Sequence, residues 1–378
     1  MSVWSIRLLL ACALTGMASM SCEAEDPIKI GLIGEITGTQ AEAGVYTVNG
    51  AKLALEEINK AGGVLGRSID LKIEDNQSTN PGTVLAFSKL IGEGGLAGII
   101  GPIRSTQIQA ASPTIKNGGI PTMIGGTDPS LTHVNNPWVF RARPNDTFSS
   151  KVIADFGINT LKLKKWAIVH STDAFGTGGK NALSAELKAL GAEPVLVQGY
   201  TNNSQDFTPI VLAIKQSGAD VMGTYMTNTA DQAIFAKQMR QLGVTPAWVG
   251  SPTTIAVTTR NLAGESLYGS YAVADFTWDA NELTQSFTKK YREKYNVDPD
   301  NFASWAYDAL YILVNAIKAA NGTDPEAIRK QILAIRDYKG LEGTYHFDEN
   351  GDGLRGYNIV KNDNGKIVFI KHIEFPIK

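Results

Sequence analysis

Two loops of this sequence carry the residue types best suited to hold a small anion. The first, residues 101–107 (Gly-Pro-Ile-Arg-Ser-Thr-Gln), joins a predicted strand to a predicted helix, and Ser105 is placed to cap that helix. Backbone N–H groups at the start of a helix attract carboxylates, so this loop is a candidate carboxylate site. The alternative is that Ser105 caps its own helix and binds nothing, and position alone does not decide between the two.

The second loop follows the predicted strand 120–124. Gly125 and Gly126 permit close approach of the backbone, and Thr127 adds a hydroxyl before Asp128, whose pairing with Pro129 predicts another helix start. A purely structural role is equally compatible with this loop alone. The two loops together favour a ligand site, because ligands of open α/β sheets bind beyond the carboxyl ends of neighbouring strands.

Motifs for catalysis and phosphate binding are incomplete. Residues 176–181 resemble a phosphate loop, but Ala174 stands where its first Gly belongs and Asn181 replaces its hydroxyl residue. No G-x-S-x-G elbow nominates a nucleophilic serine, and the four histidines lack the spacing of metal ligands. We therefore predict that the protein is not an enzyme and holds neither a cofactor nor a metal.

One acidic segment needs a separate interpretation. Residues 348–353 resemble the start of a calcium loop, but Ile359 stands where such a loop needs Glu. We interpret the segment as a polar hairpin turn between predicted strands at 345–347 and 357–360.

Composition limits the function classes. The chain has 378 residues, a formal net charge of −2, 43% hydrophobic residues and 19% charged residues. These values are typical of a soluble globular protein, and the length suggests about two domains. Lys and Arg form no cluster, so we expect no nucleic-acid partner.

Residues 1–24 are predicted to be a signal peptide. Their apolar run, 8–18, is too short for a permanent membrane span. Ordinary cleavage and lipoprotein processing at Cys22 both fit, although Ser19 stands where a lipoprotein signal usually has Leu. We expect a periplasmic protein, with a lipid anchor at Cys22 as an alternative.

The remaining chain alternates short apolar runs with amphipathic stretches, a pattern typical of parallel sheets with crossover helices. The pattern predicts an α/β fold of two Rossmann-like, doubly wound lobes joined by several short crossings. The predicted elements include strands at 28–33, 69–74, 96–100, 166–170 and 221–225, and helices at 50–61, 106–116, 181–190 and 302–320.

Several segments occur in an order and spacing that are specific only when taken together. They are 28–34, 49–54, 58–63, the two loops above, Phe140-Arg141 with Pro144, and 347–352. With them the chain resembles the periplasmic binding proteins of branched-chain amino acid ABC transporters, the Leu/Ile/Val-binding type, over essentially its whole mature length. The resemblance implies the type I fold, with a multi-crossing hinge between an N-terminal lobe (27–145 plus 276–356) and a C-terminal lobe (146–275 plus 357–378).

The same resemblance implies a function. The protein would be the extracytoplasmic solute-binding subunit of an ABC importer. It would capture a small carboxylate-bearing ligand, such as a branched-chain or other amino acid, by hinge closure and deliver it to a membrane permease. We expect it to act as a monomer. A ligand-sensing subunit of a signalling receptor would share the fold and is an alternative.

The resemblance also assigns carboxylate-binding residues. The family serine that contacts the ligand carboxylate matches Ser105, and the small-small-Thr stretch that completes this half-site matches Gly125, Gly126 and Thr127. Arg104 beside Ser105 would either aid carboxylate binding or face solvent, and a solvent-facing Arg is the default expectation.

In the second lobe, the family aromatic before a Gly matches Phe175, which lacks the hydroxyl of the usual Tyr. A further aromatic position maps between Tyr225 and Asn228.

Two departures from the family pattern concern the ligand. Ala43 replaces the usual aromatic of the first loop, and no carboxylate stands near Ser251-Pro252, where an acid usually holds the ligand amine. A buried ammonium without a counter-charge is costly. An amine-free aromatic or hydroxylated carboxylate is therefore an alternative to an amino acid.

Overall fold

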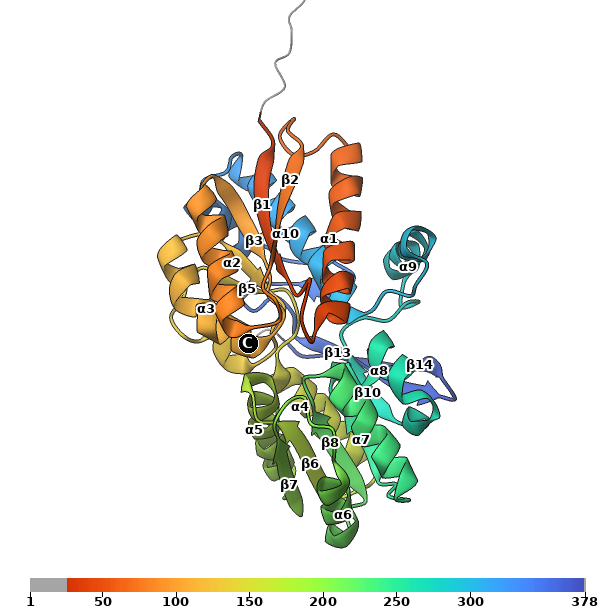
Figure 1. The fold of residues 1–378 in the computed structure, drawn as a ribbon. Coiled ribbons are helices and arrows are strands. Elements are labelled where there is room, and N and C mark those ends of the chain that lie inside the picture. Colours follow the sequence, from red (N-terminus) through yellow and green to blue (C-terminus); the bar gives the residue numbers. More distant parts are fainter. Residues whose placement is uncertain (1–25, 377–378) are drawn as a thin grey trace, which may run out of the picture.

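The computed structural model describes residues 26–376, so the predicted signal peptide and Cys22 lie outside the described residues. The chain forms two α/β lobes stacked end to end, each built on its own sheet (Figure 1). The predicted fold class is confirmed. Within the described range, none of the helices has the length and apolar character needed to cross a bilayer.

The first lobe contains a five-stranded parallel sheet in the order β2-β1-β3-β4-β5. Its strands are mostly buried, as expected for a parallel sheet covered on both faces. Their bounds are β1 (Ile28–Gly34), β2 (Ile69–Asp75), β3 (Leu96–Ile100), β4 (Thr122–Ile124) and β5 (Val139–Arg141).

The second lobe contains a seven-stranded sheet in the order β14-β13-β10-β9-β8-β6-β7. Five strands run parallel, and the C-terminal hairpin of β13 and β14 adds an antiparallel edge. The bounds are β6 (Trp166–Ser171), β7 (Leu196–Tyr200), β8 (Val221–Tyr225), β9 (Ala247–Gly250), β10 (Tyr271–Ala274), β13 (Gly356–Asp363) and β14 (Lys366–Glu374). A separate two-stranded ribbon joins β11 (Tyr338–Lys339) to β12 (Thr344–Tyr345).

Helices cover both sheets. In the first lobe they are α1 (Ala41–Lys60), α2 (Asn80–Glu93), α3 (Ser105–Gly118), α9 (Glu282–Tyr295), α10 (Asn301–Ala320) and α11 (Pro325–Leu333). In the second they are α4 (Asp146–Asp155), α5 (Ala174–Ala189), α6 (Thr208–Ser217), α7 (Thr229–Gln241) and α8 (Val257–Ala263). A π-helical turn (Phe156–Thr160) extends α4, and short 3-10 turns lie at Pro129–Thr132, Pro252–Ile255 and Gly264–Leu267.

Helix α10 is the central helix of the first lobe. Most of its residues are buried, and it packs against α1 in the main core of that lobe. Gly50 of α1 allows the two helices to approach closely. A Cβ at this position would lie only 2.0 Å from the carbonyl oxygen of Ala303 in α10.

Buried ion pairs and hydrogen bonds join the segments that pass between the lobes. Arg143, just after β5, pairs with Asp275, just after β10, at 2.5 Å. Tyr357 at the start of β13 donates from its hydroxyl to the carbonyl of Pro144 at 2.8 Å. Three stretches of chain are thereby held together between the sheets. The residue-by-residue lobe boundaries given above stay a prediction.

Three local predictions were wrong. Helix α1 begins nine residues before the predicted Gly50, and α5 begins at Ala174 rather than Asn181. The glycine-rich run 176–179 therefore lies within the first turns of α5, where Asp173 caps the helix by accepting from the Gly176 amide. The predicted hairpin around 348–353 does not form either, because Tyr345 pairs with β11 whereas Tyr357 belongs to the large sheet.

Candidate functional site

A small cavity lies between the two lobes. Its volume is about 30 Å³, enough for roughly two water molecules. Loops at the carboxyl ends of β3, β4, β6, β8 and β9 contribute to its wall, which is where open α/β sheets bind ligands. The residues that line it are Ile103, Arg104, Ser105, Thr127, Arg143, Asn301 and Phe302 from the first lobe, and Phe175, Thr227, Pro252 and Thr253 from the second.

The start of α3 is open toward this cavity. Ser105 is the first residue of the helix, Arg104 is its N-cap, and within the described residues no side-chain hydrogen bond caps the helix. The prediction that Ser105 caps it was wrong. Instead, the buried Ser105 hydroxyl accepts from the Asp128 amide at 3.3 Å and so ties together the two loops singled out in the sequence. The first N–H groups of a helix have no partner within the helix, so this end favours an anion.

Thr127 lines the cavity and is held from behind. Its Oγ1 donates to Asp146 Oδ2 at 2.8 Å, and the Ser149 hydroxyl donates to the other carboxylate oxygen at 3.0 Å. Burial raises the pKa of Asp146 to about 7. The hydroxyl of Thr127 is therefore oriented by an acid that changes charge near neutral pH.

Gly125 and Gly126 are buried behind the lining residues rather than on the wall. A Cβ on Gly125 would lie 2.9 Å from Ile103 and from Trp305, and a Cβ on Gly126 would lie 2.5 Å from Ile108. The Gly125 carbonyl accepts from Arg143 Nη1 at 3.0 Å. Close packing thus accounts for both glycines, and direct ligand contact by them stays a prediction.

Phe175 reaches the cavity from the first turn of α5, on the second lobe. Its half-buried ring packs edge-on against Tyr225, with ring centroids 5.8 Å apart. Tyr225 is fully buried, and its hydroxyl lies 2.7 Å from the hydroxyls of both Ser149 and Ser150. The structure therefore places Phe175 on the cavity wall and Tyr225 behind it.

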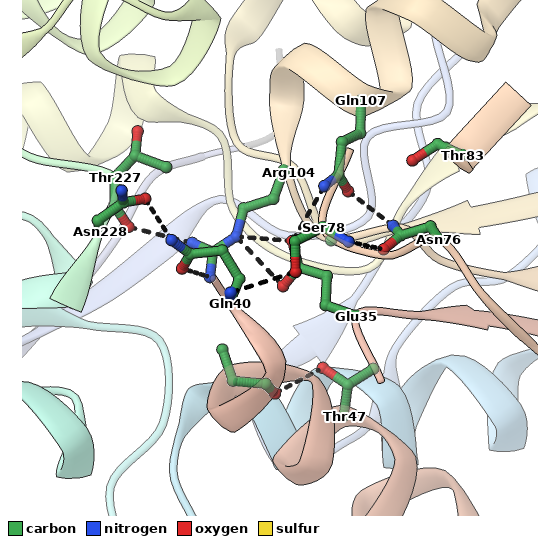
Figure 2. A network of polar contacts seen from close by, with 12 residues as sticks. Glu35, Gln40, Thr47, Asn76, Ser78, Thr83, Arg104, Gln107, Thr227 and Asn228 are labelled. Atoms are coloured by element: carbon green, nitrogen blue, oxygen red, sulfur yellow. Dashed lines mark hydrogen bonds and ion pairs between the residues drawn. The ribbon is translucent and has the colours of Figure 1, made fainter. Parts of the chain in front are cut away.

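Asn228 lies at the edge of the cleft, where the lobes touch. Its Oδ1 accepts from Gln40 Nε2 at 2.5 Å (Figure 2). Its Nδ2 donates to Asn203 at 3.1 Å. A second contact between the lobes lies nearby, where the Ala174 amide donates to Thr106 Oγ1 at 3.1 Å. Asn228 thus contacts the opposite lobe, and a direct ligand contact stays a prediction.

Arg104 is mostly buried within the cleft, so the default expectation of a solvent-facing side chain was wrong. Its side chain is 11% exposed and forms an ion pair with Glu35 at 3.1 Å. It also donates to Gln40 Oε1 at 2.8 Å and, across the cleft, to the carbonyl of Thr227 at 3.1 Å. Figure 2 shows this guanidinium between the two lobes, with Glu35 on one side and Gln40 on the other.

Glu35 is the acidic residue in the hydrogen-bond network around Arg104. It is 1% exposed and also accepts from Gln107 Nε2 at 3.1 Å, while Gln107 accepts from Asn76 at 2.9 Å. Gln107 therefore holds the Glu35 carboxylate in place, and the ion pair with Glu35 in turn fixes the side chain of Arg104 within the first lobe.

Ala43 and Ser251 mark the two positions at which the sequence departs from the family pattern. Ala43 is buried in the core of the first lobe and does not line the cavity. Pro252 and Thr253 do line it, so the absence of an acid near Ser251 leaves an uncharged stretch of wall.

Four of the nine predicted site residues line the cavity: Arg104, Ser105, Thr127 and Phe175. The sequence analysis missed Glu35, Gln40, Arg143, Asn301 and Phe302. Glu35 follows the first strand directly, and this position was a usable signal. No local pattern marks the others.

The chain matches the family model described as "Periplasmic binding protein" over residues 27–366. It is 27% identical over 374 residues to the Leu/Ile/Val-binding protein homolog 3 of Brucella melitensis. This alignment covers 96% of this chain and 99% of the relative. A crystal structure of a leucine binding protein from Thermotoga maritima superposes with a TM-score of 0.85 at 25% identity, covering 92% of this chain and 99% of that one.

A solute-binding protein of R. palustris, solved in complex with benzoate, shares the fold at a TM-score of 0.83 and 22% identity, covering 92% of this chain and 96% of that one. The matched proteins are solute-binding proteins rather than enzymes, and so is this chain. The order of its segments, its two-lobed fold and these matches agree, and the chain belongs to the periplasmic binding protein family.

Proposed function

We propose that this protein is the solute-binding subunit of an ABC importer, which captures a small carboxylate-bearing ligand between its lobes and delivers it to a membrane permease. The observation that carries the proposal is the position of the cavity. Loops of both lobes form its wall, with Ser105 and Thr127 on one side and Phe175 and Thr227 on the other. A ligand held there would contact both lobes at once and would favour the closed arrangement.

The first lobe supplies the carboxylate half of the site. The uncapped start of α3, the hydroxyl of Ser105 and the guanidinium of Arg104 together make this wall favourable for an anion. Ser105 accepts from the Asp128 amide and Arg104 donates to Glu35, so little ordering of these side chains is needed when the ligand binds.

The lobes must separate for the ligand to enter. A cavity of about 30 Å³ is far below the roughly 300–1,000 Å³ of ordinary ligand pockets. The contacts between Arg104 and Thr227 and between Gln40 and Asn228 would break on opening and re-form on closure. We infer that the described arrangement is a closed state of a hinge motion, and that the lobes stand somewhat further apart when a ligand is held between them.

Export is part of the same proposal. Residues 1–24 would direct the chain across the inner membrane and be removed; in the alternative route, cleavage before Cys22 would leave a lipid anchor on the mature protein. The mature chain would act as a monomer that presents both lobes to the permease.

A thermal-unfolding screen tests the proposed ligand class. Protein stripped of ligand by unfolding and refolding is melted with amino acids, α-keto acids and aromatic carboxylates, and with sugars and amines as compounds that lack a carboxylate. A cognate ligand at about 1,000 times its Kd adds roughly 4 kcal/mol of stability, a shift that is easily measured. Stabilisation by uncharged sugars or amines but by no carboxylate would contradict the proposal.

A genetic experiment tests the transport role. Uptake of the radiolabelled cognate carboxylate is compared in the parent strain and in a strain lacking the gene. We expect uptake to be lost on deletion and restored by the gene. Unchanged uptake, with loss of a transcriptional response to the ligand, would favour a sensing subunit instead.

A further inference from the structure

Arg143 links the cavity wall to a group of buried acids. It lines the cavity, and its Nη1 donates to the carbonyl of Gly125 at 3.0 Å, two residues before Thr127. Its Nε donates to Asp275 Oδ2 at 2.5 Å. A guanidinium has five N–H donors, and among the described residues none of the Arg143 nitrogens is a buried atom without a partner. The unused donors therefore keep access to the cavity, where they attract a ligand carboxylate.

The acids in this group outnumber Arg143. Asp275, Glu342 and Asp308 are each at most 4% exposed. If all three were ionised, one positive charge would face three negative charges inside the protein. Unmatched buried charges are costly, and an acid in such a group holds a proton instead. The charged and titratable groups that face Glu342 are Arg143 after β5, Asp275 after β10, Asp308 of α10 and Tyr345 of β12, while Tyr357 of β13 faces Asp275.

Hydrogen bonding identifies Glu342 as the acid that holds the proton. The Asp308 carboxylate accepts from two backbone amides and a tyrosine hydroxyl at 2.9–3.1 Å. Asp275 is held by its ion pair with Arg143, although its Oδ1 has no hydrogen-bond partner among the described residues. Glu342 Oε1 accepts from the Ser304 hydroxyl at 2.7 Å, and its Oε2 is buried without a partner in the described part of the chain. Of the three acids, Glu342 therefore has the least compensation for a negative charge.

The protonation of Glu342 depends on what fills the cleft. Burial raises the pKa of Glu342 well above its usual range, the charge of Asp275 raises it further, and Arg143 opposes the rise. A ligand carboxylate beside Arg143 adds a negative charge to the same group and favours the protonated acid. An open, empty cleft removes that charge and brings water to Arg143, and both changes favour the ionised acid.

We propose that Glu342 is protonated while a carboxylate ligand occupies the cleft and is partly ionised when the cleft is open and empty, so that ligand capture takes up a proton. Glu342 is not among the residues that line the cavity, and it acts on the ligand through Arg143 as a positioning residue. Capture is then tighter in acidic than in alkaline surroundings. This inference rests on the proposed function, because it needs a carboxylate in the same cleft.

Isothermal titration calorimetry between about pH 6 and about pH 8 tests the inference, with L-leucine and benzoate as probes. Both probes keep an ionised carboxylate over this range. For the wild type, we expect the Kd of the probe that binds to rise at least about threefold from the lower to the higher pH, since one full proton taken up changes affinity about tenfold per pH unit. Buffers with different ionisation enthalpies should report the same uptake at a single pH. Both signals should disappear in Glu342→Gln, whose side chain mimics the protonated acid, and should persist in the exposed control Glu193→Gln.

Asp146 is a second buried acid that titrates near neutral pH, so it needs its own control. Burial raises the pKa of Asp146 to about 7, and its carboxylate accepts from Thr127 on the cavity wall. We expect Asp146→Asn to keep the proton uptake on binding. Infrared difference spectra of the wild type, with and without the probe, should also show a protonated-carboxyl band that grows on binding. This measurement does not depend on how Glu342→Gln folds.

The outcomes separate this inference from the proposed function. Binding whose affinity and heat depend on neither pH nor buffer would overturn the inference and leave carboxylate capture standing. Proton uptake that survives Glu342→Gln, or that disappears in Asp146→Asn, would overturn the role of Glu342. Where neither probe binds, the carboxylate selected by the thermal-unfolding screen takes its place, and failure of every carboxylate would overturn both.

Discussion

Arg104 on the first lobe donates from Nη1 to the carbonyl oxygen of Thr227 on the second lobe at 3.1 Å. The same guanidinium is anchored within its own lobe by Glu35, so closing the cleft adds one hydrogen bond to a side chain that is already ordered. Because the acceptor is a backbone carbonyl, the contact depends on the geometry of closure and not on the side chain at position 227.

Arg104→Lys is expected to weaken ligand binding about tenfold. Lysine keeps a positive charge for Glu35 but cannot form the three directed contacts of the guanidinium with Glu35, Gln40 and Thr227. Titration calorimetry measures the change. The matched control is Arg240→Lys, whose side chain pairs with Glu265 while both are more than half exposed, and whose substitution should leave affinity unchanged. Equal effects of the two substitutions would contradict the role of Arg104 in closure.

Gln40 and Asn228 should be energetically coupled in ligand binding. Their hydrogen bond crosses the cleft, so each single alanine variant removes it and the double variant should lose little more. A double-mutant cycle on ligand affinity is expected to give a coupling free energy of about 0.5–1.5 kcal/mol. Strict additivity would show that this contact is not made in the ligand-bound state.

Gly126→Ala is expected to destabilise the fold by about 1–3 kcal/mol. The new Cβ would lie 2.5 Å from Ile108 and 2.8 Å from Leu131, so the packed core must shift. Gly92→Ala in α2 is the control, because its Cβ meets nothing within 4 Å and alanine is the better helix former. Urea unfolding should therefore show opposite signs for the two variants. A neutral Gly126→Ala that loses ligand binding would instead support direct ligand contact at this position.

Asp146→Asn should stabilise the protein increasingly as pH rises from about 4 to 7. Burial raises the pKa of Asp146 to about 7, so over this range the folded state holds a proton that the unfolded state releases, and stability falls with rising pH. The substitution removes this loss, and its benefit is expected to reach roughly 1–3 kcal/mol and to stay constant above pH 7. Urea unfolding at several pH values measures it, with the exposed Asp279→Asn as control. A benefit independent of pH would contradict the assignment to Asp146.

Local patterns predicted the parts of the site that follow strands. Ser105 and Thr127 were located because each lies in a loop after an apolar strand of the first sheet, and the structure places both on the cavity wall. The start of α5 was missed because glycines at 176, 178 and 179 have low helix propensity, and tertiary packing outweighs it. One such contact is the approach of Gly178 to Asp128 across the cleft.

Contacts between distant residues were beyond the reach of local patterns. Arg104 and Glu35 are 69 residues apart, and Arg143 and Asp275 are 132 apart. Neither pair shares a helix face or a strand, so no periodicity in the sequence connects them. Only the folded chain shows that both arginines of the cavity are paired with buried acids.

The distance between the two lobes, measured with and without ligand, tests the central claim most directly. Spin labels at Lys116→Cys in α3 and Lys215→Cys in α6, both exposed, report this distance by double electron–electron resonance. With a saturating ligand chosen by the thermal-unfolding screen, the distance distribution should move to shorter values and narrow. An identical distribution with and without a ligand that binds by calorimetry would contradict capture by hinge closure.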